Sequence, residues 1–196
     1  MNVAASSQVS IQSPSPSPRP LPESPDAQIV ADVGGTFARL AWSHGGAHAP
    51  RIDGFRRYRC AQYPSLAAIL ADFVTTATAT PRPAGAVVAI AGLLQGDTLV
   101  NANLPWPVSV DATRQQAGLR SLQLINDFEA VALAIPHVRS DALVALHGSA
   151  DPAMAWPALV LGPGTGLGAA LRFADGARPV LASEVGHSAL SAGTAL

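Results

Sequence analysis

The sequence is poor in cysteine, in excess charge of either sign and in long apolar runs, and each shortage excludes a class of protein. Cys60 is the only cysteine among 196 residues, which excludes an internal disulfide and fits a reducing compartment, here expected to be the cytoplasm. The 12 basic and 13 acidic side chains nearly cancel, so no broad attraction to nucleic acid or to a membrane surface is expected. No apolar run is long enough to cross a bilayer.

Serine and proline dominate the first part of the chain. The stretch from Ser13 to Pro18 alternates the two residues, and Pro20 and Pro22 follow. Repeated proline removes backbone donors and favours extended conformations, so residues 1–27 are expected to form a disordered tail. The tail lacks the apolar centre of a secretory signal, and a ligand for a proline-binding domain is the less favoured alternative. Because 48% of all residues are apolar, the rest of the chain can bury a sizeable core.

Hydrophobic periodicity after residue 27 indicates alternating strands and helices. An amphipathic helix is predicted where Leu66, Ile69, Leu70 and Phe73 fall at i, i+3, i+4 and i+7. The continuous apolar run 86–91 is typical of a central buried strand. This alternation predicts the α/β class. Further strands are expected over 28–33, 37–43, 51–60, 122–125, 158–161 and 169–173, and further helices over 111–116 and 128–135, the last with Phe128, Val131 and Ile135 on one face.

A motif of one carboxylate, two glycines and one hydroxyl follows the first predicted strand. It consists of Asp32, Gly34, Gly35 and Thr36. Adjacent glycines let the backbone turn tightly and let its N–H groups approach an anion. The Asp32 carboxylate can hold a water on Mg²⁺, and the Thr36 hydroxyl can bond a phosphate oxygen. A hairpin turn capped by Asp32 and Thr36 is the alternative interpretation.

A second glycine-rich turn lies between the last two predicted strands and contains Gly164, Thr165 and Gly166. A Walker-type phosphate loop would carry a Lys-Ser or Lys-Thr pair after its last glycine, and this turn has none. A dinucleotide-binding turn would lead into a helix, whereas residues 169–173 have the pattern of a strand. Two glycine turns, each between strands and each with a threonine, therefore predict a pair of phosphate-binding turns.

Four segments together resemble motifs of the bacterial glucokinases. Asp32–Leu40 resembles their first phosphate motif, and Leu124–Ala132 resembles the segment with their catalytic aspartate. Leu161–Gly168 is similar to their second phosphate loop, and Glu184–His187 is similar to their sugar-binding Glu-x-Gly-His motif. The order and spacing of all four match, and the resemblance extends from about Ile29 to the end of the chain.

The resemblance implies the ribonuclease H-like (actin-like ATPase) fold, an α/β architecture with a mixed β-sheet and two domains. We expect a small N-terminal domain over residues 28–136 and the beginning of the large domain over residues 137–196. The second domain would be incomplete, because glucokinases of this kind are substantially longer. The chain is therefore expected to have little or no kinase activity by itself.

The reaction implied by the resemblance is phosphoryl transfer from ATP, with Mg²⁺, to the 6-hydroxyl of glucose. Asp127 would accept the proton of that hydroxyl. Asp127 together with Asn103, Asn126, Glu184 and His187 would bind the sugar. The residues implied for the phosphates are Asp32, Gly34, Gly35, Thr36, Gly164, Thr165 and Gly166, with Asp32 holding Mg²⁺ through water. No nucleic acid or membrane partner is implied, and a homodimer is an open possibility for the assembly.

Several of these residues have simpler interpretations. Asp127 opens a predicted helix and can serve as its cap, and Asn103 can be an ordinary turn asparagine. Glu184 and His187 can be metal ligands, but zinc sites usually bring further His or Cys residues, which are lacking nearby. Two alternative functions follow at the level of the whole chain. One is a catalytically silent sugar-binding fragment, and the other is a kinase for another hexose or an acetamido sugar.

Two positions depart from the family pattern. Phe37 stands where the family usually has a small polar residue, and Val185 stands where it has a glycine. A β-branched residue rarely adopts a positive φ, so the loop around Val185 is expected to differ from that of the family.

Overall fold

The computed structural model describes residues 23–45, 50–76, 82–101, 103–147, 156–163, 167–174 and 180–183. The predicted tail therefore lies outside the described residues up to position 22. The same holds for Gly164–Gly166 of the second glycine turn and for Glu184, Val185 and His187.

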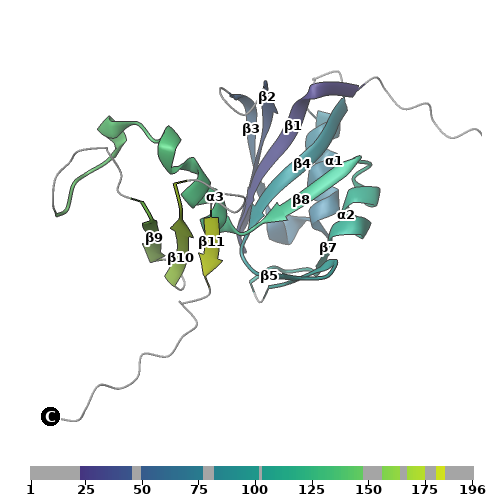
Figure 1. The fold of residues 1–196 in the computed structure, drawn as a ribbon. Coiled ribbons are helices and arrows are strands. Elements are labelled where there is room, and N and C mark those ends of the chain that lie inside the picture. The colour runs from purple at the N-terminus through teal and green to yellow at the C-terminus, as the bar shows by residue number, and fades with distance from the viewer. Residues whose placement is uncertain are drawn as a thin grey trace, which may run out of the picture.

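A five-stranded mixed sheet forms the main body of the structure (Figure 1). Its strand order is β3-β2-β1-β4-β8, with β3 at one edge. The strands β1, β2 and β3 pair antiparallel, whereas β4 pairs parallel with both β1 and β8. The carboxyl ends of β1, β4 and β8 therefore lie at the same edge of the sheet. The bounds are β1 Glu23–Val33, β2 Phe37–His44, β3 Arg51–Arg59, β4 Arg82–Ile90 and β8 Ser121–Ile125.

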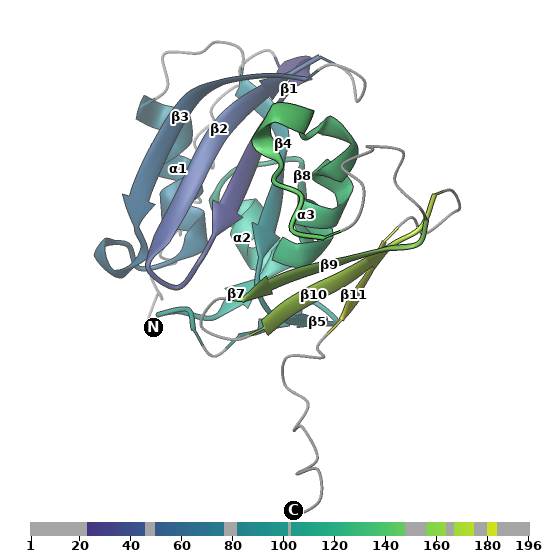
Figure 2. The same cartoon turned by 90° about the vertical axis from the view of Figure 1, so that its left-hand side faces the viewer.

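The core lies between this sheet and the helices α1 (Leu66–Thr76) and α2 (Val110–Gln116), which cover one face (Figure 2). The four residues that predicted α1 are all buried, and Phe73 lies 5.1 Å from Trp42 between ring centroids. Burying one such side chain stabilises the fold by about 1.5–3 kcal/mol relative to leaving it exposed. The periodicity prediction for α1 is thus confirmed.

The helix α3 (Asp127–Ala134) lies on the opposite face of the main sheet from α1 and α2 (Figures 1 and 2). It packs against a separate antiparallel sheet of order β11-β10-β9. The strands of that sheet are β9 Ala158–Pro163, β10 Leu167–Arg172 and β11 Val180–Ser183. A third small sheet joins β5 (Leu93–Gln95), β6 (Thr98–Val100) and β7 (Val108–Ser109). Short 3-10 turns cover Cys60–Gln62, Ile135–His137 and Ser140–Ala142.

Two of the predicted elements need correction. The first strand begins at Glu23 and not at Gln28, because its early residues pair with the start of β4, and Ala27 is buried. The expected tail therefore extends too far into the chain. In α3, Val131 is 50% exposed while Ala132 is fully buried, so the predicted contact face is wrong at that position. None of the described helices is long and apolar enough to span a membrane.

Candidate active site

The first glycine turn connects β1 to β2 and is fixed by the segment after β3. The Gly34 N–H donates to the Phe37 carbonyl oxygen at 2.9 Å, and the Cys60 N–H donates to the Thr36 carbonyl oxygen at 3.0 Å. The Cys60 Sγ donates to the Gly34 carbonyl oxygen at 3.3 Å. Burial raises the pKa of the Cys60 thiol, which keeps it protonated as a donor. Cys60 therefore holds the turn in place.

The carboxylate of this turn is already paired. Asp32 lies opposite Arg39 in the β1–β2 register, and the Arg39 guanidinium donates to the Asp32 carboxylate at 2.7 Å. Sequence analysis missed this pairing, although opposite charges placed symmetrically about a hairpin turn are a usable signal.

Asp32 is the carboxylate of the first glycine turn that the sequence analysis assigned to Mg²⁺. No group of three or more His, Cys, Asp or Glu side chains that can hold a metal occurs among the described residues. Magnesium commonly binds one or two carboxylates and takes its other oxygens from water and phosphate. A single carboxylate that already accepts from a guanidinium is compatible with contact to Mg²⁺ through water.

Asn103 lies against the first glycine turn. A Cβ atom built on Gly35 would fall 2.5 Å from the Asn103 carbonyl oxygen, so a glycine is required at that position. Asn101 fixes the segment, because its Oδ1 accepts from the N–H groups of Asn103 at 2.6 Å and Leu104 at 3.2 Å. Its Nδ2 donates to the Ala91 carbonyl just after β4. Asn101 is a positioning residue that sequence reasoning did not single out, although asparagine side chains commonly accept from the backbone N–H two residues on.

The segment between β8 and α3 carries Asn126 and Asp127. The Asn126 Oδ1 accepts from the N–H groups of Phe128 at 2.9 Å and Glu129 at 3.2 Å, which makes Asn126 the helix cap. Asp127 is the first helical residue, and its Oδ1 accepts from the Phe128 N–H at 3.0 Å. The interpretation of Asp127 as the cap is therefore wrong. Because the Oδ1 of Asn126 is used twice, its Nδ2 is the group left to donate to a ligand.

Strand register places Asp127 at the same sheet edge as the first glycine turn. Asp32 in β1 pairs with Ala89 in β4, and Ala89 pairs with Ile125 in β8. Adjacent strands are about 4.8 Å apart, so the backbones of Asp32 and Ile125 are separated by about 10 Å. Asp127 follows Ile125 by two residues, and the turn follows Asp32. Both groups therefore project from the carboxyl edge of the sheet, where α/β proteins bind ligands.

Phe128 contacts the two strands that flank the second glycine turn. Its flanking strands β9 and β10 are antiparallel, with Gly162 paired to Gly168. A Cβ atom on Gly162 would lie 2.4 Å from the Phe128 Cζ, and one on Gly168 would lie 1.8 Å from its Cε2. The residue after Asp127 thus contacts both strands of this hairpin next to its turn. Because a strand and not a helix follows the turn, the exclusion of a dinucleotide-binding fold is supported.

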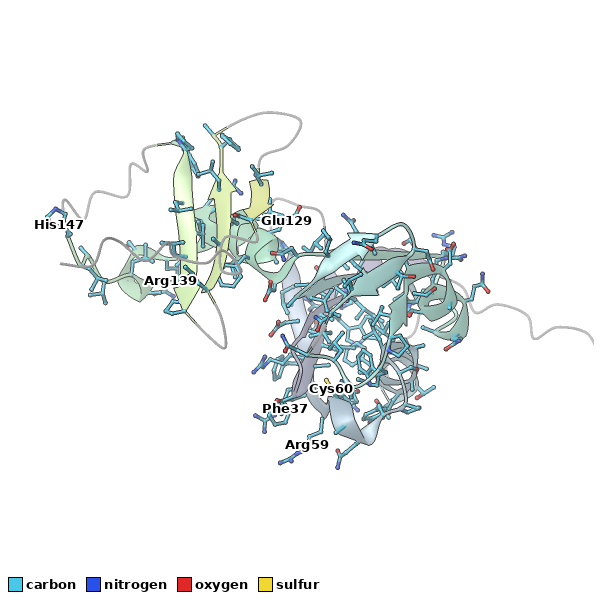
Figure 3. All side chains as sticks on the ribbon, turned by 90° about the horizontal axis from the view of Figure 1, so that it is seen from below. Phe37, Arg59, Cys60, Glu129, Arg139 and His147 are labelled. Atoms are coloured by element: carbon cyan, nitrogen blue, oxygen red, sulfur yellow. The ribbon has the colours of Figure 1, made fainter. Side chains whose placement is uncertain are left out.

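Phe37, which departs from the expected pattern, has a basic environment. The guanidinium carbons of Arg57 and Arg59 lie 4.7 Å and 5.5 Å from its ring centroid. Figure 3 shows Phe37, Arg59 and Cys60 near one another at one end of the molecule. The aromatic ring is thus stabilised by cation–π contacts with β3.

The structure thus gathers seven of the predicted residues at one end of the sheet. They are Asp32, Gly34, Gly35, Thr36, Asn103, Asn126 and Asp127. The other five, Gly164, Thr165, Gly166, Glu184 and His187, lie outside the described residues.

Comparison with known proteins adds the family. The "Glucokinase" family model matches residues 29–196. A glucokinase-like protein of Xylella fastidiosa strain 9a5c is 43% identical over 173 residues, which cover 86% of this chain and 51% of that protein. A glucokinase of Paramagnetospirillum magneticum is 38% identical over 170 residues, or 85% of this chain and 51% of that protein.

Among solved structures, a glucokinase from an Antarctic psychrotroph superposes with a TM-score of 0.70 at 31% identity, covering 86% of this chain and 53% of that one. A hexokinase of the ROK family from Thermus thermophilus has a TM-score of 0.53 at 22% identity and supports the fold alone. The chain spans about half the length of the relatives that it matches. With the expected actin-like ATPase fold and a family match that covers most of its length, the chain belongs to the glucokinase family.

Proposed function

We propose that the protein transfers a phosphoryl group from ATP to the 6-hydroxyl of glucose and yields glucose 6-phosphate. The observation that supports this most is the position of Asp127. It follows β8 at the sheet edge of the first glycine turn, and its neighbour Phe128 contacts the strands of the second. Sugar phosphorylation needs a carboxylate beside the attacking hydroxyl and donors that hold the phosphates in line with it.

Asp127 acts as the general base of the proposed reaction. One of its carboxylate oxygens accepts the proton of the 6-hydroxyl while the hydroxyl oxygen bonds to the γ-phosphorus of ATP, and the bond from that phosphorus to its bridging oxygen breaks to release ADP. The Asn126 cap fixes the first turn of α3, and with it the direction in which the Asp127 carboxylate projects. The Asn126 Nδ2 and the Asn103 side chain bind sugar hydroxyls, and Glu184 and His187 complete the sugar site as predicted from their motif. Hydrogen bonds of this kind discriminate strongly against a sugar that lacks the matching hydroxyl.

The two glycine turns bind the phosphates. Gly34 and Gly35 are exposed, the space beside Gly34 is open to an anion, and Thr36 adds a hydroxyl donor. Gly164, Thr165 and Gly166 are proposed for the same task from the opposite side. Bound ATP supplies the transferable phosphoryl group, and Mg²⁺ supplies positive charge on the phosphate oxygens. Asp32 holds the metal through water, which agrees with its shared use by Arg39.

Replacement of Asp127 tests this proposal. In the longest product that the gene encodes, Asp127→Asn is expected to lower kcat about 10²–10⁴-fold, because a general base is lost. The Kd of glucose is expected to change by less than about 5-fold, since an amide still hydrogen-bonds a hydroxyl. Glu129→Gln is the matched control, because it removes a carboxylate from the same helical turn. Both variants are measured by coupled detection of glucose 6-phosphate and by calorimetric glucose titration.

Two results would count against the proposal. Equal kcat losses in Asp127→Asn and Glu129→Gln would show that Asp127 is not the general base. A second contrary result would be a glucose-dependent rise in Tm without turnover, both in this chain and in the longest product that the gene encodes. It would favour a sugar-binding role without catalysis. A higher kcat/KM for another hexose would keep the chemistry and change the substrate.

A further inference from the structure

The ring of Phe128 fills a notch that two glycines leave in the β9–β10 hairpin. Gly162 and Gly168 face each other across the two strands. A Cβ on Gly162 would meet the Phe128 Cζ at 2.4 Å and Cε1 at 2.6 Å, and a Cβ on Gly168 would meet its Cε2 at 1.8 Å. Real Cβ atoms essentially never approach other atoms this closely. The aromatic ring therefore occupies the space of both missing side chains.

Backbone conformation does not explain these glycines. The described glycines with positive φ are Gly45, Gly54, Gly92, Gly96 and Gly118. Gly162 and Gly168 are described and are not among them, so their φ values suit any residue with a side chain. Glycine inside a strand weakens it, and a close approach by another group is the usual compensation. The contact with Phe128 is that approach.

Phe128 is joined tightly to the proposed base. Its N–H is shared between the Asn126 Oδ1 at 2.9 Å and the Asp127 Oδ1 at 3.0 Å. The Phe128 backbone is therefore tied directly to the side chains of Asn126 and Asp127. Further along α3, the Arg172 guanidinium of β10 donates to the Ala132 carbonyl oxygen at 3.2 Å. The Phe128 ring and the Ala132 carbonyl oxygen thus both contact the hairpin, and of these two residues Phe128 adjoins Asp127.

We propose that Phe128 is a positioning residue that sets the place of the Asp127 carboxylate relative to the β9–β10 hairpin. This inference rests on the proposed function. Placement errors of about 1 Å can reduce turnover by about 10²-fold, so a rigid contact at this point has direct value for the reaction.

The inference is tested by substitutions that add volume at Gly168 and remove it from the ring of Phe128. Gly168→Ala alone forces a methyl group into the ring, whereas Gly168→Ala with Phe128→Leu provides space for it. Hydrogen exchange of the Ala130 N–H, which donates to the Asn126 carbonyl oxygen at 3.0 Å, reports the first turn of α3 without any activity. We expect exchange about 10-fold faster in Phe128→Ala and in Gly168→Ala, and partial recovery in the double variant.

Turnover provides the second measurement, in the longest product that the gene encodes. Phe128→Ala is expected to lower kcat by about 10-fold or more while the KM for glucose changes less than about 3-fold, because placement is lost and sugar binding is kept. Val131→Ala is the control, since Val131 is an exposed apolar residue of the same helix. It should change neither quantity.

The outcomes separate the inference from the proposed function. Unchanged Ala130 exchange in both Phe128→Ala and Gly168→Ala overturns the inference, whatever the activity. Equal changes of kcat in Phe128→Ala and Val131→Ala also overturn it. Absence of sugar phosphorylation in the wild type overturns the proposed function, while faster exchange and its recovery would still establish the contact between α3 and the hairpin.

Discussion

Asp32 and Arg39 face each other across the first hairpin, with 2.7 Å between the carboxylate and the guanidinium. Their side chains are 56% and 46% exposed, so water and salt screen the pair. An exposed pair of this kind contributes less than about 1 kcal/mol to stability. In the proposed site, the Arg39 charge would compete with a cation for the Asp32 carboxylate.

Arg39→Gln is therefore expected to leave Tm almost unchanged and to lower the Mg²⁺ concentration needed for half-maximal turnover. Asp32→Asn should raise that concentration. Magnesium titration of glucose 6-phosphate formation measures both effects, and Arg51→Gln, at an exposed ion pair on β3, is the control. A large loss of Tm in Arg39→Gln would contradict the view that the pair is mainly electrostatic tuning.

Gly34 and Gly35 form a matched pair of sites for substitution. Gly35→Ala places a methyl group 2.5 Å from the Asn103 carbonyl oxygen, which must shift. The expected loss of stability is about 1–3 kcal/mol, typical of overpacking, together with weaker glucose binding. Gly34→Ala meets only the Phe37 carbonyl oxygen at 3.7 Å and should be tolerated in the folded state. Chemical unfolding and glucose titration of both variants provide the comparison, and equal behaviour would show that Gly35 and Asn103 are not in close contact.

Asn126 has two separable roles, because the cap uses its Oδ1 and the proposed sugar contact uses its Nδ2. Asn126→Ala should lose about 1 kcal/mol of stability as the cap is removed. Asn126→Asp keeps an acceptor for the cap but has no donor for a hydroxyl. We expect it to retain Tm and to bind glucose more weakly. Retained glucose affinity in Asn126→Asp would assign this residue to capping alone.

Cys60 predicts a dependence of stability on alkaline pH. Its thiol pKa is raised above the ordinary value of 9.0, chiefly by burial. The folded state therefore keeps the proton to higher pH than the unfolded chain, so stability is fully present below pH 9 and falls as the pH rises beyond it. Urea unfolding between pH 8 and about 10.5 should show this decline in the wild type and less of it in Cys60→Ser. A thiol that reacts rapidly with a disulfide reagent in the native protein at pH 8 would contradict the burial of Cys60.

Tyr63 provides a spectroscopic check of the packing of α1. Its hydroxyl donates to the Asp72 carboxylate, and this hydrogen bond, with some burial, raises the Tyr63 pKa to about 12. The pKa is higher in the folded state, so this contribution to stability is present below pH 10 and is lost as the pH approaches 12. Absorbance titration at alkaline pH should resolve one tyrosine near 12, and Asp72→Asn should shift it toward its ordinary value of 10.

Local sequence patterns predicted the elements whose structure depends on residues that are close together in the sequence. The spacing of Leu66, Ile69, Leu70 and Phe73 was sufficient for α1, because that helix is amphipathic and packs on a broad apolar sheet. The start of β1 could not be predicted, since Glu23 pairs with Arg82, far along the chain. The proline-rich composition of the first 22 residues predicted disorder and gave no sign of this pairing.

The candidate site divides in the same way. Asp127 and the first glycine turn follow from motifs, because each motif is a continuous stretch of sequence. The capping role of Asn126 and the anchoring role of Asn101 depend on which backbone donors lie within reach, and only coordinates provide that. The predicted face of α3 is wrong at Val131, because α3 packs against the β11-β10-β9 sheet with Ala132 fully buried and with the Phe128 ring beside Gly162 and Gly168.

The edge position of β3 has a consequence for association between molecules. A strand at the end of a sheet offers unpaired backbone groups to any extended segment that approaches. Here that strand carries Arg51, Arg56, Arg57 and Arg59, and a partner strand would have to accommodate this concentration of positive charge. Positive charge on an edge strand is a common means of opposing the addition of a further strand, and these arginines are placed to do so at the β3 edge of the main sheet.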